Sequence, residues 1–351
     1  MTLNSFKYFI HTLQFKSDFK TSVSKLKSRK VFIVELKDEN GFSFWGEAAP
    51  LPEFSSESFD EVEKELNELS QKNSFKIGNS LEEVFEQINS LSDLPTIQFA
   101  LEQIFITAIL KQNTTLINDF EFEKEINVNA VMGIETFVSA QEKLKTLIDY
   151  GYKVIKLKTS NDNFDELFNL ISWAIGELGA KVKFRIDPNQ SWNVKDTILR
   201  SERLALLPVE YIEQPVQNFD ELVETSLKSS IPIAADESVR TLEDAERLIN
   251  NSKVKFIVIK PALFGGIDKI LSLKKMIENK DVNIVVSSAF ESNIGRKHLV
   301  LTAATINNNL AHGLATSDFL TNQPCDDLFP IENGLLNFSI EKYITEIKTK
   351  F

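Results

Sequence analysis

Five short apolar runs in the second half of the chain each end in one charged residue. These charged residues are Lys158, Asp187, Glu213, Asp236 and Lys260, and the steps between them are 29, 26, 23 and 24 residues. An interval of this length holds one strand, one helix and two short connections. The spacing therefore predicts successive parallel strands that each carry one charged side chain at the same end.

The first of these runs, residues 154–159, contains a second lysine. Lys156 and Lys158 are two residues apart, so in a strand their side chains point to the same face. Two lysines alone are typical of a solvated edge strand, and a carboxylate alone could be a helix N-cap. The repetition over five strand ends favours one shared site over these separate explanations.

Three of these residues are carboxylates that would repel one another in the mouth of a barrel. Asp187, Glu213 and Asp236 need a cation to neutralise them there. Oxygen ligands without histidine or cysteine favour Mg²⁺, which Mn²⁺ can replace. A lysine acts as a base only when its ammonium form is disfavoured, and a second lysine with a divalent ion supplies that bias. The arrangement predicts proton abstraction next to a substrate carboxylate, with the metal stabilising the anion.

From residue 126 onward the chain alternates between short apolar runs and segments of helical periodicity. Strands are expected at 126–131, at the five charged runs, and at 282–287 and 310–315. Helices are expected between them, at 137–147, 164–178, 195–207, 218–228, 242–250, 267–277 and 294–306. This order predicts the α/β class and a closed (β/α) barrel of the TIM type, (β/α)7β, over residues 123–319. Such a barrel gathers its chemistry at the carboxyl ends of its strands.

Residues 1–122 do not follow this alternation and predict an α+β capping domain. Amphipathic helices follow Ser56 and Ser80, and a more apolar helix begins at Pro95. Before them, three strands are expected at 7–11, 31–36 and 41–45. The tail 320–351 is expected to rejoin this domain through a hairpin at 331–338.

Two polar loops of the capping domain are candidates to approach the barrel. One is residues 46–52, and the other is residues 16–30, which is expected to fold over the barrel mouth. Within the second loop, the residues that could contact a substrate are Lys20, Thr21, Ser22 and Arg29.

Composition excludes several classes of protein. The 351 residues carry a net charge of −12 without a basic block, which argues against nucleic acid as a partner. No apolar run is long enough to span a bilayer, and the first residues lack a secretory signal. The single cysteine, Cys325, excludes an internal disulfide. We expect a cytoplasmic protein with a small-molecule substrate, and no pattern indicates its oligomeric state.

At these motifs the chain resembles the enolase superfamily. Within the muconate-lactonizing-enzyme-like subgroup, it is most similar to the o-succinylbenzoate synthases of menaquinone biosynthesis. The resemblance covers nearly the whole chain, including the loop Gly46-Glu-Ala-Ala-Pro-Leu-Pro52. The motifs that carry it are Lys156-Leu-Lys158, Arg185-Ile-Asp187-Pro-Asn189, Glu213-Gln-Pro215, Asp236-Glu-Ser238, Lys260-Pro261 and Ser287-Ser-Ala-Phe-Glu-Ser292.

The resemblance implies a role for each of these residues. Lys158 would be the base, Lys260 would stabilise the anion, and Lys156 would contribute electrostatically. The expected Mg²⁺ ligands are Asp187, Glu213 and Asp236, oriented by Asn189 and Glu237. The expected substrate contacts are Arg185, Ser287, Ser288, Gly313, Thr21 and Ser22. The reaction would be loss of water from the dicarboxylate 2-succinyl-6-hydroxy-2,4-cyclohexadiene-1-carboxylate, giving 2-succinylbenzoate.

Other activities of the same superfamily stay open. Lysines on opposite faces of a substrate can also racemise N-succinylamino acids or epimerise dipeptides. However, Leu263 occupies a position where racemase-type relatives commonly carry arginine, and residues 312–316 lack the Asp-x-Asp of dipeptide epimerases. Muconate-type cycloisomerisation is a third possibility. A barrel that only binds ligands would lack a metal ligand or a lysine, and none is missing here.

Overall fold

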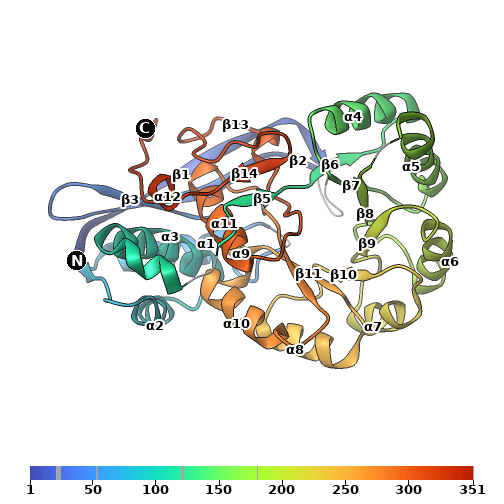
Figure 1. The fold of residues 1–351 in the computed structure, drawn as a ribbon. Coiled ribbons are helices and arrows are strands. Elements are labelled where there is room, and N and C mark those ends of the chain that lie inside the picture. Colours follow the sequence, from blue (N-terminus) through green and yellow to red (C-terminus); the bar gives the residue numbers. More distant parts are fainter. Residues whose placement is uncertain (21–24, 53, 120–121, 180, 351) are drawn as a thin grey trace.

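The computed structural model describes residues 1–20, 25–52, 54–119, 122–179 and 181–350. Thr21 and Ser22, two of the expected substrate contacts, lie outside these residues. The chain forms two parts that lie side by side (Figure 1), an antiparallel sheet with three helices and a ring of parallel strands surrounded by helices. The predicted α/β class with a TIM-type barrel and a capping domain is confirmed.

The capping part is built on an antiparallel sheet. Its strands are β1 (Thr2–Lys20), β2 (Lys25–Lys37), β3 (Ser43–Ala48) and β4 (Ser74–Lys76). Its helices are α1 (Phe59–Ser70), α2 (Leu81–Leu91) and α3 (Pro95–Gln112), and a 3-10 helix follows at Thr114–Asp119. Helix α3 is buried from Thr96 to Leu110, and it has no polar face because it packs between the sheet and the barrel.

The predicted loop at residues 16–30 is largely wrong. Strand β1 continues to Lys20 and β2 begins at Lys25, and the two strands pair in antiparallel fashion, so residues 16–20 and 25–30 belong to strands. Leu13 and Phe15 are buried while Gln14 and Lys16 are exposed, and this alternation with a period of two residues favours a strand despite the many polar residues.

The barrel part contains seven parallel strands that are neighbours in chain order. They are β6 (Ala130–Gly133), β7 (Val154–Lys158), β8 (Lys183–Asp187), β9 (Val209–Glu213), β10 (Ile233–Ala235), β11 (Phe256–Ile259) and β12 (Asn283–Val286). The helices outside the ring (Figure 1) are α4 (Phe137–Asp149), α5 (Phe164–Leu178), α6 (Val194–Leu204), α7 (Phe219–Lys228), α8 (Leu242–Asn251), α10 (Ile267–Ile277) and α11 (Asn293–Ile306). A short helix α9 (Pro261–Phe264) follows β11 directly. No helix among the described residues is long and apolar enough to cross a membrane.

The eighth strand expected at 310–315 is reduced to two bridges that close the ring. His312 pairs with Val128 and Gly313 pairs with Ser287, both in parallel. The segment is short because Asn309 has a left-handed backbone (φ +57°) and the amide of Leu314 turns back to the carbonyl of His312. Residues 312 and 313 therefore lie between the first and last strands of the ring.

The predicted strand at 126–131 is split, and this changes the partner of the C-terminal tail. Strand β5 (Glu125–Asn127) pairs with β14 (Leu335–Asn337), so the expected hairpin at 331–338 joins the barrel rather than the capping sheet. The tail reaches the capping sheet through β13 (Leu320–Thr321), which pairs with β1. The remaining elements are a 3-10 helix at Ser317–Phe319 and helix α12 (Ile340–Tyr343).

A small apolar cluster fills the inside of the barrel beneath its mouth. Its buried members are Tyr211, Ala234, Val258 and Val285, one from each of four neighbouring strands. In every case the residue two positions further along the chain is polar or charged: Glu213, Asp236, Lys260 and Ser287. Residues i and i+2 of a strand share a face, so the same alternation that fills the barrel also places these four side chains above the cluster.

Candidate active site

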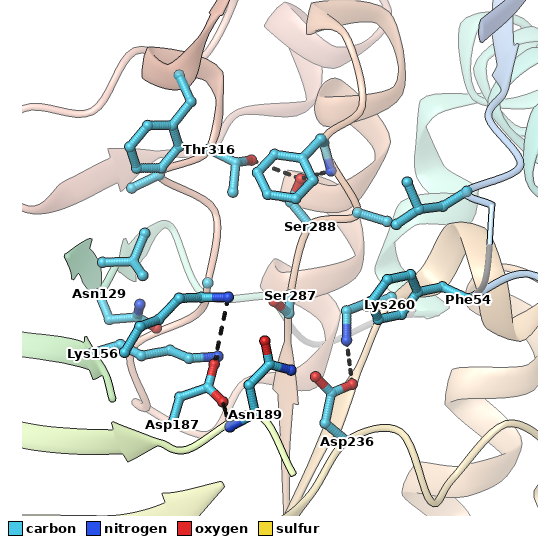
Figure 2. Close-up of a pocket in the computed structure, with 18 of the residues that line it drawn as sticks. Phe54, Asn129, Lys156, Asp187, Asn189, Asp236, Lys260, Ser287, Ser288 and Thr316 are labelled. Carbon is cyan, nitrogen blue, oxygen red and sulfur yellow. Dashed lines mark hydrogen bonds and ion pairs between the residues drawn. The ribbon is translucent and has the colours of Figure 1, made fainter. Parts of the chain in front are cut away.

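A cavity of about 800 Å³ lies at the carboxyl ends of the barrel strands. Ten of the predicted site residues line it: Lys156, Lys158, Asp187, Asn189, Asp236, Glu237, Lys260, Ser287, Ser288 and Gly313. Figure 2 shows Lys156 and Asp187 on one side of the cavity and Lys260 with Asp236 on the opposite side. The structure therefore brings together side chains that are about a hundred residues apart in the sequence.

Lysines and carboxylates contact each other on the first side of the cavity. The ammonium of Lys156 lies 2.8 Å from Asp187 Oδ2 and 2.7 Å from Glu213 Oε1. The Nζ atom of Lys158 lies 3.9 Å from Asp187 Oδ2. Glu213 is almost fully buried below the cavity, and it is held there by Lys156. Lys156 thus acts as a counter-ion for two of the three predicted metal ligands.

On the opposite side, the ammonium of Lys260 donates to Asp236 Oδ1. Lys260 directly follows β11, and Asp236 directly follows β10. These strands are neighbours in the sheet, so their ends place the two groups next to each other. Every predicted carboxylate ligand therefore has an ammonium partner in the structure.

These ion pairs determine the protonation of the site. Burial lowers the pKa of Lys156, but the charges of Asp187, Glu213 and Asp236 outweigh burial and hold the pKa well above its usual range. The pKa of Lys260 is raised in the same way, because Asp236 and Glu237 outweigh its burial. Both lysines therefore keep their protons and cannot act as resting bases.

The carboxylates carry an excess of negative charge. Burial raises the pKa of Glu213 to about 7, and the charges of Asp187 and Asp236 add to this shift while Lys156 opposes it. A divalent ion among these groups would remove that repulsion. The residue types and their adjacent strand ends therefore fit the Mg²⁺ that the sequence predicts.

The side-chain orientations differ from this prediction. Among the described residues, no group of three or more Asp, Glu, His and Cys side chains is arranged to hold a metal ion. The physical reason is that the oxygens of Asp187, Glu213 and Asp236 are directed to the ammonium groups of Lys156 and Lys260. The expectation that the three carboxylates converge on one point is thus wrong for this arrangement of the side chains.

Asn189 and Glu237 connect two of these carboxylates. The amide N–H of Asn189 donates to Asp187 Oδ1 at 2.9 Å, and its side-chain Nδ2 donates to Glu237 Oε1 at 3.2 Å. Burial raises the pKa of Glu237 to about 8, and the charge of Asp236 adds to this shift. These contacts are consistent with the predicted role of both residues in orienting the carboxylates.

Gln214 is a positioning residue that the sequence did not single out. Its Oε1 accepts hydrogen bonds from the backbone N–H groups of Asp236 and Ser238, at 3.0 and 3.2 Å, and its Nε2 donates to Ser238 Oγ at 2.7 Å. Its own backbone is left-handed (φ +36°), which is strained for a residue other than glycine. The side chain fixes the loop after β10, and with it Asp236.

Ser287, Ser288 and Gly313 lie on the third side of the cavity. A Cβ atom at Gly313 would lie 2.9 Å from Ser287 Oγ, so glycine allows the two bridged segments to approach. Ser288 Oγ donates to Glu291 Oε2 at 2.6 Å and accepts from Thr316 Oγ1 at 2.7 Å. These contacts fix a wall of small polar residues opposite the carboxylates.

Residues of the capping domain and of loops complete the cavity. Those that the sequence did not identify are Leu51, Phe54, Asn129, Val131, Ala289, Phe290, Ala315, Thr316 and Phe319. Leu51 belongs to the predicted loop 46–52, three residues after the end of β3, and Phe54 lies two residues beyond that loop. The loop 46–52 was expected to approach the barrel. However, the sequence does not show whether an isolated apolar residue such as Leu51 lines the cavity or packs in the core.

Arg185 does not line the cavity, in contrast to the predicted contact with a substrate carboxylate. Its side chain is fully buried inside the barrel, where Nε donates to Glu210 Oε2 at 2.7 Å and Nη1 donates to Asn129 Oδ1 at 2.9 Å. It also stacks on Tyr211. The residue shares the inward face with Asp187 but lies one layer deeper, and it reaches the cavity only through Asn129.

Arg29, another candidate for substrate contact, is also buried away from the cavity. Its guanidinium donates to the carbonyl of Ala49 and lies close to Glu47 and Glu291. His312, which the sequence placed near the active end, accepts from the backbone N–H of Val286 through Nδ1. Burial lowers the pKa of His312 to about 3, so this residue is a neutral part of the structure.

Comparison with known proteins agrees with this fold. Residues 139–340 match the family described as "Enolase C-terminal domain-like". The chain therefore belongs to the enolase superfamily, and it has the architecture of an enzyme of that group. Residues 3–104 match the family described as "MenC, N-terminal domain". The predicted resemblance to the o-succinylbenzoate synthases is confirmed at the level of these families.

Individual relatives carry more than one function. The chain is 28% identical to the L-Ala-D/L-Glu epimerase of Francisella tularensis subsp. novicida (strain U112), over 88% of this chain and 87% of the relative. It is 34% identical to the o-succinylbenzoate synthase of Thermobifida fusca (strain YX), over 56% of this chain and 63% of the relative. The crystal structure of the dipeptide epimerase from Enterococcus faecalis V583 with Mg and the dipeptide L-Leu-L-Tyr has the same fold, with a TM-score of 0.85, 21% identity and coverage of 97% and 98%.

Proposed function

We propose that this protein is an Mg²⁺-dependent o-succinylbenzoate synthase that dehydrates 2-succinyl-6-hydroxy-2,4-cyclohexadiene-1-carboxylate to 2-succinylbenzoate. The observation that carries the proposal is the match of residues 3–104 to the MenC N-terminal domain. This capping domain supplies Leu51, at one wall of the cavity, and the loop that leads to Phe54. The part of the chain that contacts a substrate from above is thus the part that resembles the synthases.

The metal site supports this function through its charge. Asp187, Glu213 and Asp236 would hold Mg²⁺ once their oxygens turn away from the lysine ammonium groups. Bound there, Mg²⁺ supplies positive charge to the substrate carboxylate, which makes the proton on the adjacent carbon more acidic. A dipeptide epimerase of the same fold was crystallised with Mg, which supports the choice of metal.

Lys158 and Lys260 have different roles in the proposed reaction. Lys158 lines the cavity, with its Nζ atom 3.9 Å from Asp187 Oδ2, and in this proposal it takes the proton from the carbon next to the carboxylate. Lys260 keeps its proton and lies on the opposite side, where its ammonium stabilises the negative charge that develops on the substrate. The proton taken by Lys158 leaves with the substrate hydroxyl as water, and the ring becomes aromatic.

A dipeptide epimerase is the second candidate, because relatives named L-Ala-D/L-Glu epimerase and L-amino acid-D/L-Glu epimerase match this chain at an identity similar to that of the synthases. The charges of the cavity support the synthase. An epimerase must bind the ammonium group of its substrate, and the acids among the described cavity residues are Asp187, Asp236 and Glu237. All three contact a lysine or Asn189. The opposite wall, at 313–316 and 287–290, presents hydroxyl and apolar groups.

The test is an absorbance assay with the diene substrate. We expect turnover with Mg²⁺, loss of turnover with EDTA, and recovery when Mg²⁺ is restored. Lys158→Ala and Lys260→Ala should each lower kcat by about 10³-fold or more, while circular dichroism shows an intact fold. The matched control is Lys183→Ala, which removes an exposed lysine at the other end of β8. Full activity of Lys158→Ala would exclude this lysine as the base.

A second assay separates the synthase from the epimerase. The protein is incubated in D₂O with Mg²⁺ and either a set of dipeptides or N-succinylamino acids, and deuterium at the α-carbon is measured by mass spectrometry. We expect exchange at least about 10²-fold slower than dehydration of the diene, because the described cavity has no free acid for an ammonium group. Rapid exchange into dipeptides, together with no dehydration, would assign the epimerase instead.

A further inference from the structure

A second cavity adjoins the active-site cavity beyond Lys260. It has a volume of about 650 Å³ and shares Phe54, Asp236, Glu237 and Lys260 with the first. Figure 2 shows Phe54 and Lys260 on the same side of the first cavity, opposite Lys156. The two cavities are therefore adjacent, and we call them the first and second lobes; Phe54 and Lys260 belong to the wall of both.

The second lobe has an apolar wall and one cationic end. The apolar residues that line it, besides Phe54, are Pro95, Val239, Val258, Leu263 and Phe264. The polar residues beyond the shared ones are Ser56, Arg240 and Thr241. A substrate group suited to this lobe would have apolar atoms next to the reacting centre and a negative charge further away.

Arg240 differs from the other cations of the two lobes. Lys156 and Lys260 form close ion pairs with carboxylates, and Lys158 lies near Asp187. Arg240 is exposed to solvent, and no ion pair of its side chain is found among the described residues that line the two lobes. Its guanidinium is thus available for a ligand.

Asp244, four residues after Arg240, has a carboxylate that is engaged by the backbone. Asp244 Oδ2 accepts from the backbone N–H groups of Arg240 and Thr241, at 3.1 and 3.0 Å, as part of the cap of α8. This cap fixes the backbone from which the Arg240 side chain starts. It also engages the Asp244 carboxylate with the backbone.

We propose that the second lobe binds a carboxylate of the substrate that is remote from the reacting carbon, with the Arg240 guanidinium as its partner. The inference rests on the proposed function, whose substrate carries a succinyl side chain. The methylene groups of that chain would pack on the apolar wall near Leu263, and the terminal carboxylate would pair with Arg240 in the bidentate geometry that arginine favours. Arg240 determines specificity and takes no part in proton transfer.

The kinetic test compares a diacid with a monoacid. Arg240→Ala should raise KM for the diene diacid by about 30-fold and leave kcat within about twofold, because the proton-transfer groups are untouched. For an analogue in which a methyl group replaces the succinyl carboxylate, the same variant should leave KM unchanged. The KM of Arg240→Lys for the diacid should lie between that of the wild-type protein and that of Arg240→Ala. An equal change in KM for both substrates, or no change for the diacid, would overturn the proposal.

A matched control comes from α8, the helix that begins two residues after Arg240. Arg247 lies on α8, pairs with Asp220 and stacks on Phe219, and it does not line either lobe. Arg247→Ala should leave KM for both substrates unchanged. This result separates the loss of a positive charge on α8 from the loss of the charge at the lobe.

A binding experiment keeps the inference distinct from the proposed function. Calorimetry with Mg²⁺ measures the affinity of 2-succinylbenzoate and of 2-butanoylbenzoate, which lacks the terminal carboxylate. We expect wild-type protein to prefer the diacid by about 30-fold and Arg240→Ala to lose that preference. If the diene is not dehydrated but this pattern holds, the proposed function fails and the carboxylate site stands. Equal affinities for both ligands, or no binding of the diacid, would refute the site.

Discussion

Replacement of Glu47 should weaken the junction between the capping domain and the barrel. Glu47 lies on β3 and is fully buried, and its carboxylate accepts from Ser292 N–H at 3.0 and 3.1 Å, from Gly295 N–H at 3.2 Å, and from the Ser292 hydroxyl. These donors belong to the first turn of α11, whose N-terminal N–H groups have no partner within the helix. The carboxylate supplies that partner and complements the helix dipole.

The size of the effect follows from these contacts. Glu47→Ala leaves three buried donors without an acceptor, and each costs about 1 to 3 kcal/mol. Some relaxation of Ser292 reduces the sum, so we expect a loss of about 3 to 5 kcal/mol in the free energy of unfolding. Glu47→Gln retains one acceptor oxygen and should cost about 1 to 2 kcal/mol. The backbone of Glu47 stays in place, because Gln103 binds its N–H and its carbonyl, each at 3.1 Å.

Urea unfolding followed by tryptophan fluorescence measures both variants. The matched control is Glu68→Ala, which removes an exposed glutamate on α1 and should change the free energy by less than about 0.5 kcal/mol. The reasoning fails if Glu47→Ala stays within about 1 kcal/mol of wild type. It also fails if Gln and Ala cost the same, because the retained oxygen would then make no contribution.

Three further substitutions test other parts of the structure. Burial lowers the pKa of Lys297 to about 7, so the folded state binds fewer protons than the unfolded state between pH 7 and about 10.4, and stability rises with pH over that range. Lys297→Met should therefore stabilise by about 2 to 3 kcal/mol at pH 7 and by less than about 1 at pH 10, measured by urea unfolding; equal gains at both pH values would contradict this. Gln214→Leu leaves the N–H of Asp236 without its acceptor and should lower kcat by more than about 10-fold, with the diene assay as the measurement. Gly266→Ala places a Cβ against the Glu102 carboxylate at a φ of +92° and should cost at least about 3 kcal/mol in thermal unfolding.

The charged strand ends could be predicted because two local periods determine them. The interval of one strand and one helix places each charge at the same end of the barrel, and the period of two residues places it on the inward face. Both rules hold for Lys158, Asp187, Glu213, Asp236 and Lys260 in the structure. Neither rule depends on contacts between distant segments, so a single sequence is sufficient.

The predictions of site residues were wrong or incomplete where the depth of a side chain inside the barrel, or packing between distant segments, determines whether it lines the cavity. The inward face of β8 includes both Arg185 and Asp187, and only the layer they occupy separates a barrel-filling residue from a cavity residue. The period of two residues carries no information on that layer. Likewise, Phe54 and Leu51 reach the cavity because the capping sheet packs over the barrel, and this packing involves residues far apart in the chain.

The orientation of the carboxylates depends on the total charge of the site. In the structure, the ammonium groups of Lys156 and Lys260 face the three carboxylates Asp187, Glu213 and Asp236, so one negative charge is in excess. From the sequence, Lys156 and Lys260 are expected to act on the substrate, and their ion pairs with the carboxylates are not predicted. Without a metal, the nearest cations determine where carboxylate oxygens point.

The same count of charges explains why the proposed reaction requires both the metal and the substrate. The ammonium groups of Lys156 and Lys260, together with one divalent ion, would balance the carboxylates of Asp187, Glu213 and Asp236 and the ring carboxylate of the substrate. Burial and the charge of Asp236 raise the pKa of Glu237 to about 8 in the metal-free protein, so Glu237 adds little negative charge to the free site at pH 7. The bound state is then close to neutral, and the second negative charge that develops on the substrate faces the ammonium of Lys260. The free protein lacks both the divalent ion and the substrate carboxylate. We therefore expect Mg²⁺ and the substrate each to increase the affinity of the protein for the other.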